Sequence, residues 1–263
     1  MSNLVMTGIS RQMRIVSALT IREVRLRNSK HAFKQLFDLG EMLFAIVIHW
    51  GIFEFTHHKL LIGDSLLLFI MTGLFPVLYF RIISMRAATA IDASRAVTII
   101  PYIEAIDYAI ARCFVEFLAF TMIFIMMLAM IGLFGTSRFI FPYRPFAFIE
   151  FLILISLFAF GIGLINAFLI YLVPIWRIAW SLIARVQIFF AAVFYIPEYM
   201  NEHMRYYLSF SPIMHFVALC RSAFYPTYPM HLLSVNYILG WTAAVMMLGL
   251  AIERALRNYR AAN

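Results

Sequence analysis

Residues 211–228 read SPIMHFVALCRSAFYPTY, and this stretch decides how the rest of the chain is interpreted. Ser211 and Pro212 are typical of a helix start, because serine caps the first free N–H groups and proline fits the first turn. Pro226 prevents the helix from continuing. The apolar run between the prolines covers about a dozen residues, or roughly 18 Å of helix, whereas a bilayer core needs about 20 residues. We therefore predict a re-entrant or membrane-surface helix whose backbone is buried in protein or lines a cavity.

The composition of the chain is that of an integral membrane protein. Of its 263 residues, 64% are hydrophobic and only 13% are charged, whereas soluble domains carry about 25% charged residues. The net charge of +8 comes from basic residues that stand beside apolar runs. Topology signals are placed in this way, so we expect no nucleic-acid partner. The two cysteines, Cys113 and Cys220, define no disulfide framework.

Six apolar segments predict an all-α integral membrane protein with six transmembrane helices. The segments are about 36–56, 65–84, 108–134, 146–173, 175–196 and 235–252. An even number of spans places both termini on one side, and lysines and arginines concentrate in the connections of that side. Because basic residues favour the cytoplasm, both termini are predicted to be cytoplasmic. Residues 1–35 then form an N-terminal cytoplasmic segment, and residues 36–263 form the membrane domain.

A second short helix is expected directly before the one described first. Residues 197–210 (PEYMNEHMRYYLSF) begin with proline and an acidic residue, which favours a helix start. Short re-entrant or periplasmic helices therefore precede the last span, and their tyrosines make an aromatic-rich outer cap.

Residues 8–27 predict an amphipathic helix at the inner membrane interface. At about 100° per residue, Arg11, Arg14, Arg22 and Arg25 fall in one sector, and apolar side chains fall opposite. A basic sector opposite an apolar one favours a surface of anionic lipids. An ordinary basic tail that only sets the topology is the alternative.

The connection 86–104 (RAATAIDASRAVTIIPYIE) is the main cytoplasmic feature after the second span. It combines small residues with Asp92 and Arg95, and an apolar run that includes Ile99 ends at Pro101. This pattern predicts a short helix that leaves the membrane and returns. Such a helix is a docking element if a soluble partner exists, and otherwise it is a solvated connector.

Ionisable residues mark the start of the third span. Asp107 is placed to cap this helix, and Arg112 and Glu116 stand four positions apart on it. Their charges can therefore neutralise each other near the inner interface. Whether they pair with each other or across a dimer stays open.

The motifs of several enzyme classes are absent from the sequence. It contains no G-x-x-x-x-G-K-[ST], no H-E-x-x-H, no G-x-S-x-G and no C-x-x-C. His49 in the first span has no second histidine at a ligand spacing, so no metal site is expected. A membrane conduit without its own nucleotide site is expected to take its energy from another subunit. The chain is therefore predicted to be a transport subunit rather than an enzyme, with a lipid-modifying membrane enzyme as one alternative.

Three motif blocks occur in a fixed order on this topology. They are residues 72–76 (TGLFP), then Pro101, Asp107, Ala111, Arg112 and Glu116, and last Pro212, His215, Arg221, Phe224 and Tyr225. The chain resembles the permeases of type-2 ABC exporters in these blocks, and in particular the capsular-polysaccharide and O-antigen export permeases of Gram-negative bacteria. It departs from the family pattern at Ser211 and Ala218, where the family has asparagine and glutamate.

The resemblance implies a homodimer bound to two copies of a separate ATPase subunit in the bacterial inner membrane. ATP and Mg²⁺ would be used by that subunit, and no cofactor is expected on this chain. The implied cargo is a lipid-linked, anionic polysaccharide or glycolipid, with membrane lipids and periplasmic export proteins as further partners. An exporter of a drug or small lipid is the alternative within transport.

The resemblance also gives three groups of candidate site residues. An anionic polymer needs cations and aromatic faces along its path. The candidates for this path are Arg81, Arg86, Arg112, Trp176, Trp180 and Tyr195. The candidates for coupling to the ATPase are Asp92, Arg95, Ile99 and Pro101, and those for an outer gate are Pro212, His215, Arg221, Phe224 and Tyr225.

Overall fold

The computed structural model describes residues 2–30, 32–55, 60–94, 103–135 and 137–262, and no strand occurs among them. The elements are the α-helices α1 (Ser2–Lys30), α2 (Ala32–Phe55), α3 (Leu66–Ala93), α4 (Ala105–Leu133), α5 (Pro145–Leu172) and α6 (Trp176–Phe190), the 3-10 helix η2 (Pro197–Tyr199), and the α-helices α7 (Glu202–Ser209), α8 (Pro212–Phe224) and α9 (Val235–Ala262). The predicted all-α class is confirmed for these residues.

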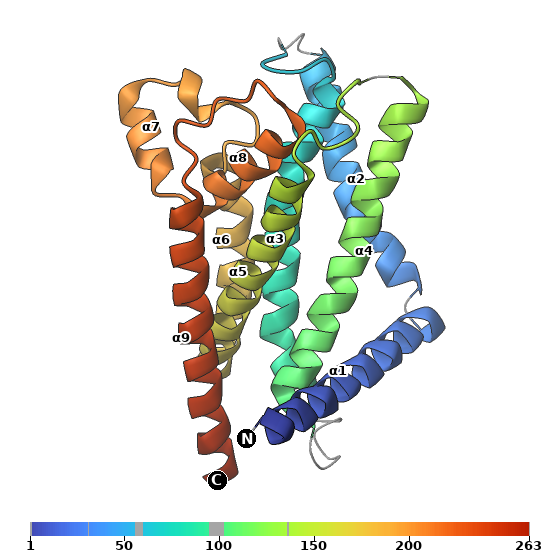
Figure 1. Ribbon diagram of the computed structural model, residues 1–263, viewed down its shortest axis with the longest axis vertical. Helices are drawn as coiled ribbons and strands as arrows, with labels where there is room; N and C mark the ends of the chain where they lie inside the picture. Colours follow the sequence, from blue (N-terminus) through green and yellow to red (C-terminus); the bar gives the residue numbers. More distant parts are fainter. Residues whose placement is uncertain (1, 31, 56–59, 95–102, 136, 263) are drawn as a thin grey trace.

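The long helices run side by side between two ends of the molecule (Figure 1). We call these the α1 end, where α1 lies across the bundle and both termini are found, and the α8 end, which carries α7 and α8. Within the described part of the chain, four helices are long and apolar enough to cross a membrane: Leu66–Ile91, Ala105–Leu133, Pro145–Leu172 and Val235–Arg257. Helices α2 and α6 also run between the two ends, but the apolar part of α2 is short and α6 has only 15 residues. The structure therefore confirms several membrane spans but does not establish six.

Two helices end at other residues than the spans predicted from the sequence. Helix α3 does not stop near residue 84 but continues to Ala93, because residues 86–93 are mostly good helix formers. Of the predicted coupling residues, Asp92 thus lies in α3, and its side chain is not described; Arg95, Ile99 and Pro101 lie outside the described residues.

The helix that covers the fifth predicted span, 175–196, is shorter than the predicted span. Helix α6 stops at Phe190, and Ala192 has a φ of 55°, which no helix accommodates. The apolar residues up to 196 therefore form turns rather than the end of a span. The anchor that holds these turns is described with the site below.

Helix α3 is the centre of the bundle. In its most apolar window 78% of the residues are buried, against 22% in α9, which lies at the edge. Phe75 of α3 packs against Phe124 of α4, with ring centroids 4.3 Å apart, and Phe148 of α5 extends this cluster at 5.3 Å from Phe124. Aromatic packing of this kind, together with apolar burial, holds α3, α4 and α5 together.

The helix predicted from residues 211–228 is confirmed as α8. The Ser211 side chain accepts a hydrogen bond from the Met214 N–H at 3.4 Å, Pro212 occupies the first turn, and the helix ends at Phe224, two residues before Pro226. Every side chain from 213 to 225 is buried. The backbone of this short helix is thus enclosed by protein, as a segment of this length within a membrane requires.

Candidate functional site

Five arginines from three helices line one cleft of ≈ 480 Å³. Arg81 and Arg86 come from α3, Arg112 comes from α4, and Arg177 and Arg185 come from α6. Their convergence creates a strongly cationic hollow, because arginine stays charged at every physiological pH. Such a hollow is suited to bind anions such as phosphate or carboxylate groups.

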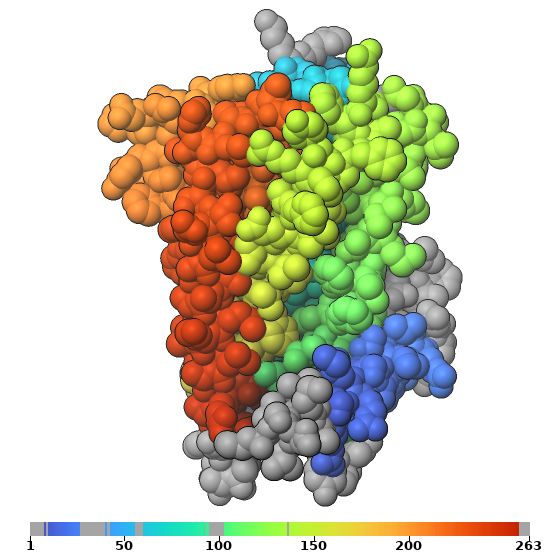
Figure 2. Space-filling model, viewed as in Figure 1, coloured from blue at the N-terminus to red at the C-terminus, as the bar shows by residue number. Residues whose placement is uncertain are grey.

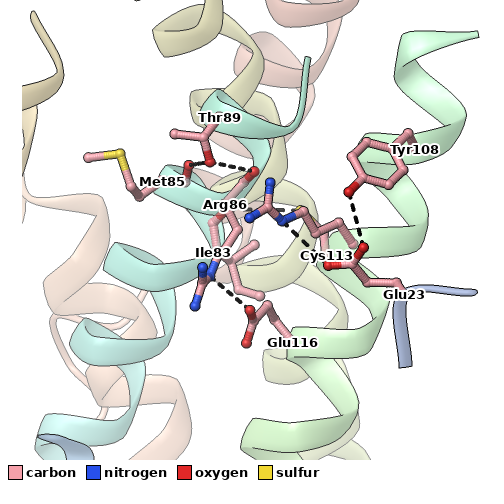
Figure 3. Close-up of polar contacts among 9 residues, drawn as sticks. Glu23, Ile83, Met85, Arg86, Thr89, Tyr108, Cys113 and Glu116 are labelled. Carbon is pink, nitrogen blue, oxygen red and sulfur yellow. Dashed lines mark hydrogen bonds and ion pairs between the residues drawn. The ribbon is translucent and has the colours of Figure 1, made fainter. Parts of the chain in front are cut away.

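Two arginines of this cleft form ion pairs with buried glutamates. Arg86 Nε lies 2.8 Å from Glu116 Oε1, and Arg112 Nε lies 3.8 Å from Glu23 Oε1. The ion pairs found here thus join α3 to α4 and α4 to α1, whereas the spacing on α4 had suggested Arg112 with Glu116. Figure 3 shows Glu116 directed at Arg86, and Glu23 beside Tyr108. Five arginines against two glutamates leave the cleft cationic.

One aromatic candidate lies in the cleft and two do not. Trp180 lines it and is held by a hydrogen bond from its Nε1 to Ser84 Oγ at 3.4 Å. Trp176 instead donates its Nε1–H to Asn166 Oδ1 at 2.7 Å. Tyr195 lies beyond the end of α6, and its hydroxyl donates to the Phe189 carbonyl at 2.8 Å. Of the predicted path, the structure therefore brings together the three arginines and Trp180.

Sequence reasoning missed the two arginines of α6. Neither Arg177 nor Arg185 is among the candidates for the cargo path that were named from the sequence. They stand eight positions apart with Ser181 halfway, and all three line the cleft. Residues at this spacing share one helix face, so a helical projection of α6 contained the signal.

Helix α1 is fixed to the start of α4 by polar contacts. Glu23 accepts a hydrogen bond from the Tyr108 hydroxyl at 3.0 Å in addition to its ion pair with Arg112. Gln12 donates to Asp107, whose other carboxylate oxygen accepts the Glu104 N–H at 3.0 Å. Asp107 thus caps α4 as predicted, although from the third helical position, with Glu104 as the N-cap.

Arg221, a predicted gate residue, is completely buried at the α8 end. Its Nη1 donates to the carbonyls of Ala192 at 2.8 Å and Tyr195 at 3.1 Å, and its Nη2 donates to that of Val193. The guanidinium lies 4.0 Å above the ring of Phe69. This arrangement, which we call the Arg221 anchor, holds the turns that follow α6 against α8.

The close packing around position 73 explains why the motif at residues 72–76 contains a glycine there. A Cβ atom at this position would lie 2.6 Å from Arg221 Nη2 and 2.8 Å from the Val193 carbonyl oxygen. Both contacts are shorter than real Cβ contacts, and the second is to backbone, which cannot move aside easily. Two motif blocks that are distant in the sequence, 72–76 and 212–225, therefore meet at the Arg221 anchor.

The other predicted gate residues also contact the protein itself. His215 Nε2 lies 2.8 Å from the Ser209 carbonyl, and its Nδ1 accepts the Ser234 N–H at 3.3 Å. Phe224 packs on the ring of Phe148 with centroids 5.4 Å apart. Pro212 starts α8, and Tyr225 is buried next to Gly63, where a Cβ would clash with its ring. The block thus fastens α8 to its neighbours.

Similar proteins were found along nearly the whole chain. The polysialic acid transport protein KpsM of Escherichia coli is 27% identical over 94% of this chain and 95% of its own length. The capsule polysaccharide export inner-membrane protein CtrC of Neisseria meningitidis is 23% identical over 92% of this chain and 90% of its own. No protein-family model matches the chain.

Fold and relatives together define a multi-pass protein of the bacterial inner membrane. The resemblance seen in the motif blocks is confirmed: the chain is a homologue of the capsular-polysaccharide export permeases of type-2 ABC exporters. The relatives are transport proteins and do not favour a membrane enzyme or an exporter of small lipids.

Proposed function

We propose that the chain is the permease subunit of an ATP-driven exporter that moves a lipid-linked, anionic capsular polysaccharide across the inner membrane. The arginine cleft carries this proposal, because five converging arginines attract an anionic cargo more strongly than a neutral or cationic one. The names of the relatives support the same cargo class. The anionic end of the glycolipid binds in the cleft, and Trp180 offers a ring on which a sugar stacks.

The proposed topology has six passes, with α2 and α6 completing the set. The α1 end is cytoplasmic, which fits the basic residues of the connections there. Residues 1–35 then form an interface segment on the inner membrane surface, and residues 36–263 form the membrane domain. The anionic cargo reaches the cleft from the cytoplasmic side, where it is synthesised, and leaves past α7 and α8.

A homodimer is the proposed working form. Helix α6 exposes an apolar stripe that includes Ile178, Leu182 and Val186, and α2 exposes Phe44 and Val47. Helix α2 contacts the turns that follow α6 through the stacked rings of His49 and Phe194, whose centroids are 5.0 Å apart. A second copy would cover both stripes and place two arginine clefts side by side, which widens the path for a polymer.

The family also implies an ATPase partner, since the chain has no P-loop of its own. We propose that the connection 86–104, with Asp92, Arg95, Ile99 and Pro101, docks one copy of that subunit, so that the homodimer binds two copies. ATP with Mg²⁺ is bound there and not on this chain. Further export proteins on the periplasmic side complete the route.

The test is polysaccharide export by cells whose only copy carries Arg177→Gln and Arg185→Gln. Each arginine lost from an anion contact weakens binding by about 1.5–3 kcal/mol, or roughly tenfold or more. We expect surface polysaccharide to fall and lipid-linked polymer to accumulate inside, with normal protein levels in the membrane. Arg254→Gln on α9 is the matched control, because it removes the same charge from an exposed residue that does not line the cleft.

Normal export by the double variant would refute the role of the cleft. A mild-detergent purification tests the other half of the proposal. A P-loop ATPase that co-purifies in stoichiometric amount supports it, and a chain that purifies alone and gives no ATP hydrolysis contradicts it.

A further inference from the structure

A second hollow of ≈ 420 Å³ lies between α4, α5 and α9, with α3 as its floor. We call it the apolar groove. Its lining includes Tyr79 and Ile83 on α3, Phe114 on α4 and Leu157 on α5. Figure 2 shows it as a furrow between α4 and α5, with α3 visible at the bottom. Tyr79 and Arg81 stand two positions apart on α3, which turns them to different faces, so the groove and the arginine cleft lie on different sides of α3.

The lining of the groove is apolar and suited to bind hydrocarbon. The one polar pair on its lining, the Tyr79 hydroxyl and Ser156 Oγ, is satisfied internally at 2.6 Å, and Ser156 also donates to the Leu152 carbonyl. The rim is exposed and apolar: Ile110, Phe114 and Ile153 show 38%, 47% and 54% of their surface. An occupant of this groove therefore brings hydrocarbon and no hydrogen-bonding groups.

One basic residue, Arg257, stands on the groove-lining face of α9 beyond the residues that line the groove. Arg257 of α9 forms an ion pair with Glu104, the N-cap of α4, and so bridges the two helices that form the walls. Met246 lines the groove on the same face of α9, eleven positions earlier, or about 16 Å along the helix. Half of a bilayer core is about 15 Å thick. A lipid whose phosphate lies beside Arg257 would thus place its chain at the level of Met246.

We propose that the apolar groove binds one acyl chain of an anionic glycerophospholipid from the inner leaflet, with its phosphate at Arg257. Basic sites between transmembrane helices on the cytoplasmic side are suited to anionic head groups. The assignment to the inner leaflet rests on the proposed topology. The lipid is a resident one and not the cargo, because the arginine cleft that would bind the cargo faces another side of α3.

The experiment counts the phospholipids that the purified chain retains. The protein is reconstituted in vesicles of phosphatidylglycerol and phosphatidylethanolamine, extracted in mild detergent and measured by native mass spectrometry. Leu157→Trp fills the groove and is expected to lower the retention of phosphatidylglycerol about tenfold, the equivalent of roughly two buried methylenes. Met122→Trp is the matched control, since Met122 is 71% exposed on α4 and does not line the groove.

Two further variants test the head group with opposite signs. Arg257→Gln removes the cation, so the preference for phosphatidylglycerol should fall. Glu104→Gln releases Arg257 from its carboxylate partner, so the same preference should rise. If the ion pair only held α4 against α9, both variants would shift the lipid count in the same direction, and the proposed head-group site would be wrong.

Unchanged retention in Leu157→Trp would overturn the groove as a lipid site. Cross-linking of Ile153→Cys between two copies in the membrane would also overturn it, because another protein chain would then occupy the groove. Lipid retention is measured without export, and export by the Arg177 and Arg185 variants is measured without lipid counting. Failure of this inference is therefore distinguishable from failure of the proposed function.

Discussion

From the contacts of the Arg221 anchor we predict that a single substitution by an unbranched apolar side chain, Arg221→Met, causes a large loss of stability. Three charge-assisted hydrogen bonds would be lost, and each contributes about 1.5–3 kcal/mol, which gives up to about 9 kcal/mol. Burying the guanidinium opposes this by several kcal/mol. The carbonyls of residues 192, 193 and 195 would be left without this donor in a buried site. We therefore expect the free energy of unfolding to fall by about 3 kcal/mol or more.

Two companion variants make the cause specific. Arg221→Lys keeps the charge, but a single ammonium group cannot reproduce the fork that reaches three carbonyls, so it should lose nearly as much stability. Gly73→Ala places a Cβ 2.6 Å from Arg221 Nη2 and should disturb the same contact from the other side. Because both changes act on one contact, the double variant Arg221→Met with Gly73→Ala should lose less than the sum of the two.

The assay is denaturant unfolding in mild detergent, combined with hydrogen exchange of the amides in residues 191–196. The anchor predicts faster exchange there in Arg221→Met, while the centre of α3 stays protected at the start of unfolding. Arg205→Gln on α7 is the control and should change stability by less than about 0.5 kcal/mol. A loss below that value in Arg221→Met, or strict additivity with Gly73→Ala, would refute the reasoning.

Two further predictions concern the α1 end and a loop at the α8 end. Glu23→Gln weakens the contact between α1 and α4, so hydrogen exchange in α1 should become faster while that of α5 is unchanged, and equal rates would show that Glu23 does not hold α1. Burial raises the pKa of the Asp64 carboxyl. Hydrogen bonds from Ser137 Oγ and the Arg138 N–H together lower this pKa by more, so the net pKa lies below its usual value. The stabilisation from Asp64 is thus present above the usual carboxyl pKa of about 4 and is lost as the pH falls through the lowered value. In the wild type, proteolysis of the loop that contains Asp64 should therefore increase in acid. Asp64→Asn should increase this proteolysis at neutral pH and remove its dependence on acid.

Features that depend on neighbouring residues could be predicted from the sequence, and those that depend on packing could not. The start and end of α8 follow from Ser211, Pro212 and Pro226, because capping and proline geometry act within a few residues. The end of α6 does not follow from its own apolar residues. It is set by Arg221, nearly thirty positions away, and no local pattern contains that information.

The candidate site shows the same division. Arg81, Arg86 and Arg112 could be proposed because the resemblance implies an anionic cargo, which needs cations along its path. The partner of Glu116 could not be read from the spacing on α4, since Arg86 reaches it from α3. Likewise, the i,i+4 rule describes one isolated helix, whereas here the arginines and glutamates that pair come from three helices.

Helix α6 connects the two ends of the molecule. Arg177 and Arg185 on it line the arginine cleft, and the turns that follow its last residue are fixed by the Arg221 anchor. Its cleft end is held by two hydrogen bonds, from Trp176 to Asn166 and from Trp180 to Ser84, and the turns after its other end are held by three buried hydrogen bonds from Arg221. A change in the width of the cleft therefore requires less free energy as a movement of the Arg177 end of α6 than as a shift of the whole helix, because the latter would break the buried hydrogen bonds of Arg221. Because the Arg221 anchor fixes the turns after Phe190, we expect cargo in the arginine cleft to move the Arg177 end of α6.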